Sequence, residues 1–421
     1  MRDHPIKVVA AGSVGSIMEY YDFALYGYFT PILTKLFFPE ASPVIGLIAT
    51  LGVFASGYLM RPVGAFIFGH IGDTVGRGRA LFLSILLMAI PTFLLGCLPT
   101  YGQIGFWAPV LLVILRLLQG ISVGGEFTGA MIYLAENAPK GRSGFFASFA
   151  TAGANIGMLL GSGVGAFIAS ALNDQQLMSW GWRVPFWFGL AVALQGIVIR
   201  AKSKAEKPMI SPGEKQINPI REVLTTHFGL LMRLTGITWF IAVGFNITFT
   251  YLSTYLAAQT HVPLAVALEI NSVAMLVLIV MEPLAGHLSD RYGRKPFLLV
   301  SAVGLMLLAW PAFRIMTDGN PDNDLWIQCV LAVLVSLFNG VYPAMMVEMV
   351  PVRIRMTLLS LSIGLGLGVF GGTAPLFSTL LIQWTGSNTA PAFYLIFSAV
   401  LGFVLILTTK SSKVNAVREI A

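Results

Sequence analysis

The sequence predicts an all-α membrane protein in which twelve transmembrane helices form two pseudo-symmetric bundles of six. Three observations lead to this fold class. Of the 421 residues, 56% are apolar and only 11% are charged, whereas soluble proteins carry about 25% charged residues. Apolar stretches that can cross a bilayer, which takes roughly 20 residues, recur along the whole chain. One charged motif also occurs twice, once in each half of the sequence.

The apolar stretches form two sets that are separated by a polar segment rich in Lys, Glu and Pro. The first set comprises 8–36, 44–70, 78–98, 108–136, 143–172 and 182–200, and the second comprises 228–258, 263–288, 296–316, 325–349, 355–384 and 389–409. We therefore expect four parts, namely an N-terminal bundle at 1–200, a cytoplasmic linker loop at 201–227, a C-terminal bundle at 228–409 and a short cytoplasmic tail at 410–421.

Lys and Arg gather on one side of the predicted membrane. With a cytoplasmic N-terminus, 21 of the 26 Lys and Arg residues fall on the cytoplasmic side, and only Lys35 and Arg314 fall on the outer side. This asymmetry is the positive-inside bias, so it predicts that both termini are cytoplasmic. It also explains the net charge of +7 without nucleic acid. Cys97 and Cys329 lie far apart in apolar stretches, so we expect no thiolate metal site.

The repeated motif reads GHIGDTVGRGR from position 69 and GHLSDRYGRK from position 286, with five identities in nine aligned positions at an offset of 217. Each copy follows the second span of its half, which indicates a repeat architecture. Its aspartates can cap a helix N-terminus or pair with an arginine, and its arginines can bind carboxylates. We predict that they gate the cytoplasmic side, although turns that only set topology are the competing interpretation. The gating candidates are Asp73, Arg77, Asp290 and Arg294.

With this motif the chain resembles the major facilitator superfamily, whose signature GxxGDxxGR follows the second span. More specifically it resembles the metabolite–proton symporters, which include proline/betaine, α-ketoglutarate, citrate and shikimate permeases. The matching stretches are EYYDFALYGY (19–28), GVFASGYLMRPVGA (52–65), LRLLQGISVGGEFTGA (115–130), GWRVPF (181–186), LSDRYGRKP (288–296) and FGGTAPL (370–376). The resemblance implies the twelve-helix major facilitator fold, proton coupling and uptake of a small metabolite by alternating access.

Ionisable side chains inside spans are costly and therefore indicate functional sites. Glu19 and Asp22 share one face of the first span, and Arg116, Gln119 and Glu126 share one face of the fourth. We predict Asp22 as the main proton carrier and Arg116 as a partner that the substrate can draw away, which would let the carboxylate bind a proton. A static buried ion pair is the alternative. The predicted proton-coupling residues are Asp22, Glu19, Arg116 and Glu126.

Arginines near a central cavity suit a carboxylate, which a guanidinium can bind through two hydrogen bonds. For Arg61 and Arg183, bracing of helices is the competing interpretation, and for Asn246 and Tyr251 it is hydrogen bonding between helices. Tyrosines of the first span offer a further possibility, a cation–π cage for a quaternary ammonium. The predicted substrate-binding residues are Arg116, Gln119, Tyr26, Arg61, Arg183, Asn246, Tyr251 and Glu282.

These features predict a proton-coupled symporter that imports a small carboxylate-bearing metabolite, either an organic acid or a zwitterion such as proline or betaine. The alternative is a proton-coupled efflux antiporter. By resemblance, the drug-efflux relatives carry a Pro within the glycine pattern of the fifth span, which this chain lacks. We expect a functional monomer in the bacterial inner membrane whose partners are substrate, proton and lipid. No enzymatic activity, cofactor, metal or nucleic acid is expected. The proton gradient would supply the driving force, so no nucleotide site is needed, and the sequence has no P-loop that would contradict this.

Overall fold

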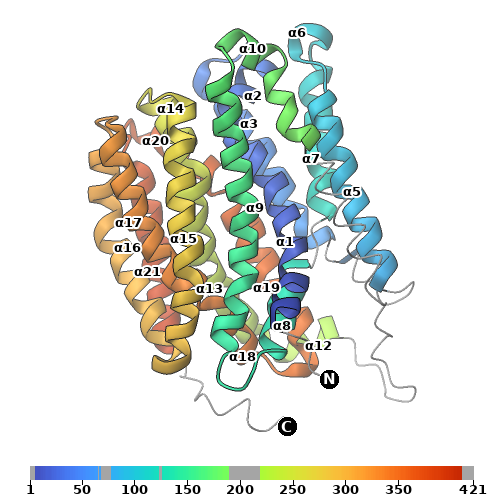
Figure 1. Cartoon of the computed structure of the whole chain (residues 1–421), viewed down its shortest axis with the longest axis vertical. Helices are drawn as coiled ribbons and strands as arrows, with labels where there is room; N and C mark the ends of the chain where they lie inside the picture. The colour runs from blue at the N-terminus through green and yellow to red at the C-terminus, as the bar shows by residue number, and fades with distance from the viewer. Residues whose placement is uncertain (1–4, 65, 68–76, 123–125, 189–218, 410–421) are drawn as a thin grey trace.

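The computed structural model describes residues 5–64, 66–67, 77–122, 126–188 and 219–409. Every regular element in these ranges is helical, and the long helices stand side by side as one bundle (Figure 1). Each span runs in the opposite direction to the span before it, because short loops connect long helices that lie side by side. The fold therefore follows the sequence in order, one span after another.

The N-terminal half contains the first five predicted spans and the beginning of the sixth. The predicted span 8–36 is divided, because Pro31 stands at the start of a new helix just after Tyr28. The span 182–200 is described only to residue 188. The elements are α1 (Pro5–Tyr28), α2 (Thr30–Phe37), α3 (Pro43–Leu59), α5 (Arg77–Cys97), α6 (Tyr101–Ile104), α7 (Trp107–Ser122), α8 (Glu126–Glu136), α9 (Ser143–Ala171), α10 (Asp174–Ser179) and the 3₁₀ turn η1 (Gly181–Arg183).

The C-terminal half contains six further spans. Two of them are interrupted by π-helical stretches, a feature that often accompanies functional sites. The elements are α12 (Pro219–Thr226), α13 (Phe228–Phe245), the π-helix η2 (Asn246–Tyr251), α14 (Leu252–Gln259), α15 (Leu264–Tyr292), α16 (Arg294–Met316), α17 (Pro321–Asn339), α18 (Tyr342–Met349), the 3₁₀ turn η3 (Val352–Ile354), α19 (Arg355–Ile363), the π-helix η4 (Gly364–Gly371), α20 (Ala374–Thr385) and α21 (Ala390–Thr408).

Nine helical segments among the described residues are long and apolar enough to cross a membrane. The other three predicted spans are α1, α5 and the partly described segment 182–200. One end of the bundle carries α12, and the opposite end carries α6 and α10 (Figure 1). We refer to these as the α12 end and the α10 end.

The predicted linker 201–227 is not a loop throughout, because its last part forms α12. Val223 is fully buried where α12 packs against α13 and α19. Arg353 adds an ion pair, since its Nη2 lies 2.9 Å from Glu222 Oε2. The prediction missed this helix because Lys and Pro dominate the linker as a whole. Residues 201–218, like the tail 410–421, lie outside the described ranges.

Helix α9 connects the two halves, because it packs along α1 on one side and along α15 on the other (Figure 1). The contact with α1 depends on glycine. A Cβ atom added at Gly157 would lie only 2.1 Å from the carbonyl oxygen of Ile17. Small residues at such positions let the backbones of membrane helices approach closely. The glycine spacing in this span therefore serves close packing.

Replacing Gly157 with alanine should destabilise the protein, because the added methyl group would force α1 and α9 apart. Overpacking of this kind costs about 1–3 kcal/mol, so the Tm of the purified protein in detergent should fall. Gly163→Ala is the matched control on the same helix, since a Cβ there would meet no atom within 4 Å. An equal Tm for the two variants would contradict the proposed close contact.

Candidate functional site: a buried charge cluster

The predicted acidic residues of the first span lie in the interior of the N-terminal half. The exposed fractions of Glu19 and Asp22 are only 2% and 3%. The helices α3, α5 and α7 enclose these two residues of α1. Helix α1 packs against α3, and α7 packs against both α3 and α5. A buried carboxylate requires donors or a counter-charge, and these helices supply both.

Asp22 is held by neutral donors. Gln119 Nε2 lies 2.9 Å from Asp22 Oδ2 and 3.1 Å from Oδ1, and Thr92 Oγ1 lies 2.5 Å from Oδ1. Arg116 Nη1 in turn donates to Gln119 Oε1 at 2.9 Å. Arg116 is therefore connected to Asp22 through the amide of Gln119, and not by the direct ion pair that the sequence suggested.

Thr92 was not predicted as a site residue. Its only signal in the sequence is that it is a polar residue directly after Pro91 in the otherwise apolar stretch 86–97. A threonine in a membrane helix usually bonds its own backbone, and Thr92 Oγ1 indeed lies 2.8 Å from the carbonyl oxygen of Met88. Only the packing of α5 against α7 and α1 brings it to Asp22.

Glu19 lies beside the second buried arginine. Arg61 Nη2 is 3.6 Å from Glu19 Oε1, and both side chains are almost completely buried. Together with Asp22 and Arg116, these residues form a cluster of two acidic and two basic side chains, which we call the charge cluster. Its formal charge is zero when both acids are ionised, which limits the energetic cost of burying it.

The aromatic side chains around the charge cluster are occupied by the arginines. The guanidinium carbon of Arg61 lies 4.3 Å from the ring centroid of Tyr58 and 4.6 Å from that of Phe23. The guanidinium carbon of Arg116 lies 4.5 Å from the ring centroid of Tyr26 and 4.8 Å from that of Phe23. These rings therefore stabilise protein cations, so in this arrangement their faces are not open to a quaternary ammonium.

One edge of the Arg116 guanidinium is unused. Its Nε and Nη2 atoms have no hydrogen-bond partner among the residues that the structure describes, whereas Arg61 Nη2 lies within ion-pair distance of Glu19. These two nitrogens form the side of a guanidinium that binds a carboxylate bidentately. For Arg116 this edge faces Gly57, where an added Cβ would lie 3.3 Å from Nη2 and 3.5 Å from Nε. The charge cluster thus retains capacity to bind an anion.

Other predicted residues of this half lie elsewhere. Arg183 Nη1 binds the carbonyl oxygens of Gly96 and Leu98 at the end of α5, at 3.0 and 2.5 Å, which is the bracing alternative. Tyr26 contacts Arg116 of the charge cluster through its ring, and its hydroxyl donates to the carbonyl oxygen of Thr50. Asp73 lies outside the described residues, and so do the side chains of Arg77 and Glu126.

Two predicted residues of the C-terminal half, Asn246 and Tyr251, make hydrogen bonds within that half. Asn246 donates to the carbonyl oxygen of Ala242 and accepts from Thr250, and the Tyr251 hydroxyl lies 3.4 Å from Thr379 Oγ1. Only the Tyr251–Thr379 contact joins two helices, whereas both contacts of Asn246 lie within its own span. Glu282 faces the other half, where its Oε1 accepts a hydrogen bond of 2.6 Å from Asn155.

The second copy of the repeated motif joins the halves at the α12 end. Asp290 accepts hydrogen bonds from the backbone N–H groups of Gly144 at 2.8 Å and Phe145 at 3.0 Å, so it caps the N-terminus of α9. Arg294 lies 2.8 Å from both Asp290 Oδ1 and Glu348 Oε1. Arg353 and Arg355, which follow Glu348 in the sequence, pair with Glu222 and Glu136.

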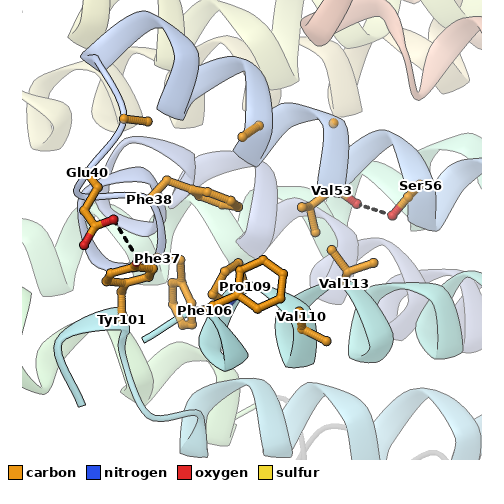
Figure 2. Close-up of a pocket in the computed structure, with 13 residues that line it drawn as sticks. Phe37, Phe38, Glu40, Val53, Ser56, Tyr101, Phe106, Pro109, Val110 and Val113 are labelled. Carbon is orange, nitrogen blue, oxygen red and sulfur yellow. Dashed lines mark hydrogen bonds between the residues drawn. The ribbon is translucent and has the colours of Figure 1, made fainter. Parts of the chain in front are cut away.

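A pocket of about 530 Å³ lies between α3 and α7, next to α2 and α6 (Figure 2). Its walls are mainly apolar, and at one end Tyr101 donates a hydrogen bond of 2.8 Å to Glu40. This hydrogen bond raises the pKa of the Tyr101 hydroxyl. None of the predicted site residues is among the residues that line the pocket. The pocket and the charge cluster are therefore separate features.

The fold and the buried charges define a membrane transporter, and comparisons with known proteins agree. The sequence profile of the Major Facilitator Superfamily matches residues 12–313 and 234–420. The chain therefore belongs to the Major Facilitator Superfamily, and both the predicted fold class and the predicted family are confirmed. It is a multi-pass membrane protein of a family of transporters.

Among curated relatives, the chain resembles metabolite transporters over nearly its whole length. It is 34% identical to the proline/betaine transporter of Escherichia coli strain K12, over 96% of this chain and 83% of that protein. It is 31% identical to the citrate–proton symporter of Klebsiella pneumoniae, over 93% of this chain and 88% of that protein. A solved D-xylose–proton symporter has the same fold, with a TM-score of 0.76 at 18% identity over 98% of this chain and 99% of that one.

Gly57→Ala should impair solute uptake, because the new methyl group would press on the open edge of Arg116 and lie 3.1 Å from the backbone oxygen of that residue. A perturbation of about 1.4 kcal/mol corresponds to a tenfold effect, and overpacking commonly costs this much. We expect roughly a tenfold lower uptake rate in proteoliposomes. Gly52→Ala on the same helix, where a Cβ meets no atom within 4 Å, should behave as wild type. Equal activity of both variants would argue against this edge as a binding site.

Proposed function

We propose that the protein is a proton-coupled symporter that imports a small carboxylate-bearing metabolite, an organic acid or a zwitterion such as proline or betaine. The relatives at 31–34% identity include a citrate–proton symporter and proline/betaine transporters, whose substrates all carry a carboxylate. The observation that carries the proposal is the connection from Asp22 through Gln119 to Arg116, whose Nε–Nη2 edge has no hydrogen-bond partner in the described part of the chain.

The chemistry of this arrangement supports coupling. A substrate carboxylate that binds the open edge of Arg116 would compete for the positive charge that now stabilises ionised Asp22. Asp22 would then bind a proton more readily, so that substrate and proton occupy the protein together. Because the coupling between two binding sites is reciprocal, a proton on Asp22 raises the affinity for the substrate by the same factor. Glu19 and Arg61 supply a second pair that keeps the surrounding charge balanced.

We also infer the orientation of the protein. In this proposal the α12 end faces the cytoplasm of a bacterial inner membrane, the termini are cytoplasmic, and the bundles extend over 1–200 and 228–409. Contacts between halves occur at both ends. Asp290 reaches α9 at the α12 end, and Ser162 Oγ donates to the carbonyl oxygen of Leu268 at 3.1 Å nearer the α10 end. We interpret this as an occluded state, from which either end opens in turn.

The direct test is uptake into proteoliposomes under an imposed inward proton gradient, with labelled citrate, α-ketoglutarate, shikimate, proline and betaine. Accumulation of one compound that a protonophore abolishes would establish symport and identify the substrate. Exit of a preloaded compound under an opposing proton gradient, without any inward accumulation, would instead support the efflux antiporter.

Asp22→Asn should abolish accumulation driven by the proton gradient, because the amide cannot carry the coupled proton. Exchange of labelled for unlabelled substrate at equal pH should persist, since that process needs no net proton movement. Asp174→Asn, which removes an exposed carboxylate on α10, is the control and should leave both activities intact. Gradient-driven accumulation by Asp22→Asn would exclude Asp22 as the proton carrier.

Arg294→Ala should loosen the α12 end, because Arg294 holds both Asp290 and Glu348. We expect faster hydrogen–deuterium exchange of the backbone amides at the start of α9, including Gly144 and Phe145, which now donate to Asp290. Arg291→Ala removes an exposed arginine three residues earlier and should leave this exchange unchanged. Identical exchange in the two variants would assign the repeated motif to topology rather than gating.

A further inference from the structure

The seam between α9 and α15 contains polar contacts at three levels. At the α12 end, Asp290 binds the first backbone amides of α9. Nearer the α10 end, Ser162 Oγ donates to the carbonyl oxygen of Leu268 and accepts from Ser272 at 2.9 Å. Between these two levels, Asn155 Nδ2 donates to Glu282 Oε1 at 2.6 Å. Alternating access must break the contact at the α12 end and the contact nearer the α10 end in turn. The Asn155–Glu282 contact lies between these two levels.

Like buried Asp324 on α17, Glu282 has no cation within ion-pair distance among the described residues. Its side chain is fully buried, and its Oε2 atom has no hydrogen-bond partner in the described ranges. Asp290 has Arg294, and Glu19 has Arg61. The backbone of α17 closes tightly over Glu282, since a Cβ added at Gly340 would lie 2.2 Å from the Glu282 carbonyl oxygen.

The elements packed against α15 offer no nearby positive charge to Glu282. They are α9, α14, α16 and α17. Helix α9 contains no ionisable side chain along its length, and α14 contributes only Tyr255. The charged residues of α16 and α17 stand in their first or last turns, namely Arg294, Lys295, Arg314, Asp322 and Asp324. Two neutral amides, those of Asn155 and Asn339, are thus the counterparts of this carboxyl group.

An ionised carboxylate in this place would be costly, because it has lost its hydration and has gained only neutral donors. A protonated carboxyl group still accepts the hydrogen bond from Asn155 and avoids the cost of a buried unpaired charge. When either end of the seam opens, water can reach Glu282 and solvate the ionised form. Closing of the halves and binding of a proton are therefore thermodynamically linked at this residue.

We propose that Glu282 is a second proton-binding residue, distinct from Asp22, that takes up a proton when the two halves close along α9 and α15 and releases it when they open. Closure itself then depends on pH, with or without substrate. The inference builds on the proposed symport, because it assigns Glu282 to the coupling of protons to closure. It replaces our prediction that Glu282 binds the substrate.

The test measures closure directly and needs no substrate. Cys97 and Cys329 are first replaced by serine. Spin labels are then attached at Lys140→Cys and Arg291→Cys, two exposed positions near the α12 end. The distance between the labels reports the distance between the halves. With Glu282 and Asn155 unchanged, the ratio of closed to open molecules should decrease as the pH is raised from 6 to 9. One linked proton changes this ratio by at most about tenfold per pH unit. In Glu282→Gln the ratio should be independent of pH, since the amide is neutral throughout.

Three controls make the outcome specific. Glu269→Gln neutralises an exposed glutamate on the same helix and should keep the pH dependence. Asp22→Asn should also keep it, which separates Glu282 from the proton carrier. Glu282→Leu provides a second neutral residue if the glutamine variant does not fold, and it should likewise remove the pH dependence.

A ratio that stays constant with pH while Glu282 and Asn155 are unchanged would overturn the proposal. So would an unchanged pH dependence in both neutral variants of Glu282. The symport proposal fails on different evidence, namely the absence of gradient-driven uptake. Because the distance measurement requires neither uptake nor a known substrate, the two results can be told apart.

Discussion

The buried charges of α1, α3 and α7 can lie inside a membrane protein only because they satisfy one another. Two acids and two arginines share one region of the N-terminal half, and aromatic rings take the place of water around the guanidinium groups. Removing a single member would leave its partner charged and unsolvated, which is far more costly than removing a pair. The packing of these helices is thus dictated by the need to bring the charges together.

This constraint also explains the two faces of α9. Toward α1 the helix presents glycine, which allows the backbones to touch and closes the N-terminal half around the charge cluster. Toward α15 it presents Asn155 and Ser162, which make hydrogen bonds across the seam. Breaking such a hydrogen bond costs little free energy when water takes the place of the lost partner. One face therefore suits a permanent contact, and the other suits a contact that opens in each cycle.

The fold was predictable from the sequence because apolar length and the placement of Lys and Arg act locally along the chain. The pairs within the site were not predictable to the same extent. Helical periodicity places Glu19 with Asp22, and Arg116 with Gln119, on shared faces. It does not say how one helix is rotated and shifted against the next. That register decides that Gln119 stands between Asp22 and Arg116, and that Thr92 reaches Asp22.

The two halves differ in the kind of buried polar atom that they leave without a hydrogen-bond partner. In the described C-terminal half these atoms are oxygens, such as those of Asp324 and Gln328, whereas in the N-terminal half they include two guanidinium donors, Nε and Nη2 of Arg116. A buried donor without an acceptor costs free energy. A protein retains such a cost at a site where a ligand supplies the missing acceptor during function. In our proposal this difference places recognition of the carboxylate in the N-terminal half, and the C-terminal half contributes to coupling through the seam that it forms with α9.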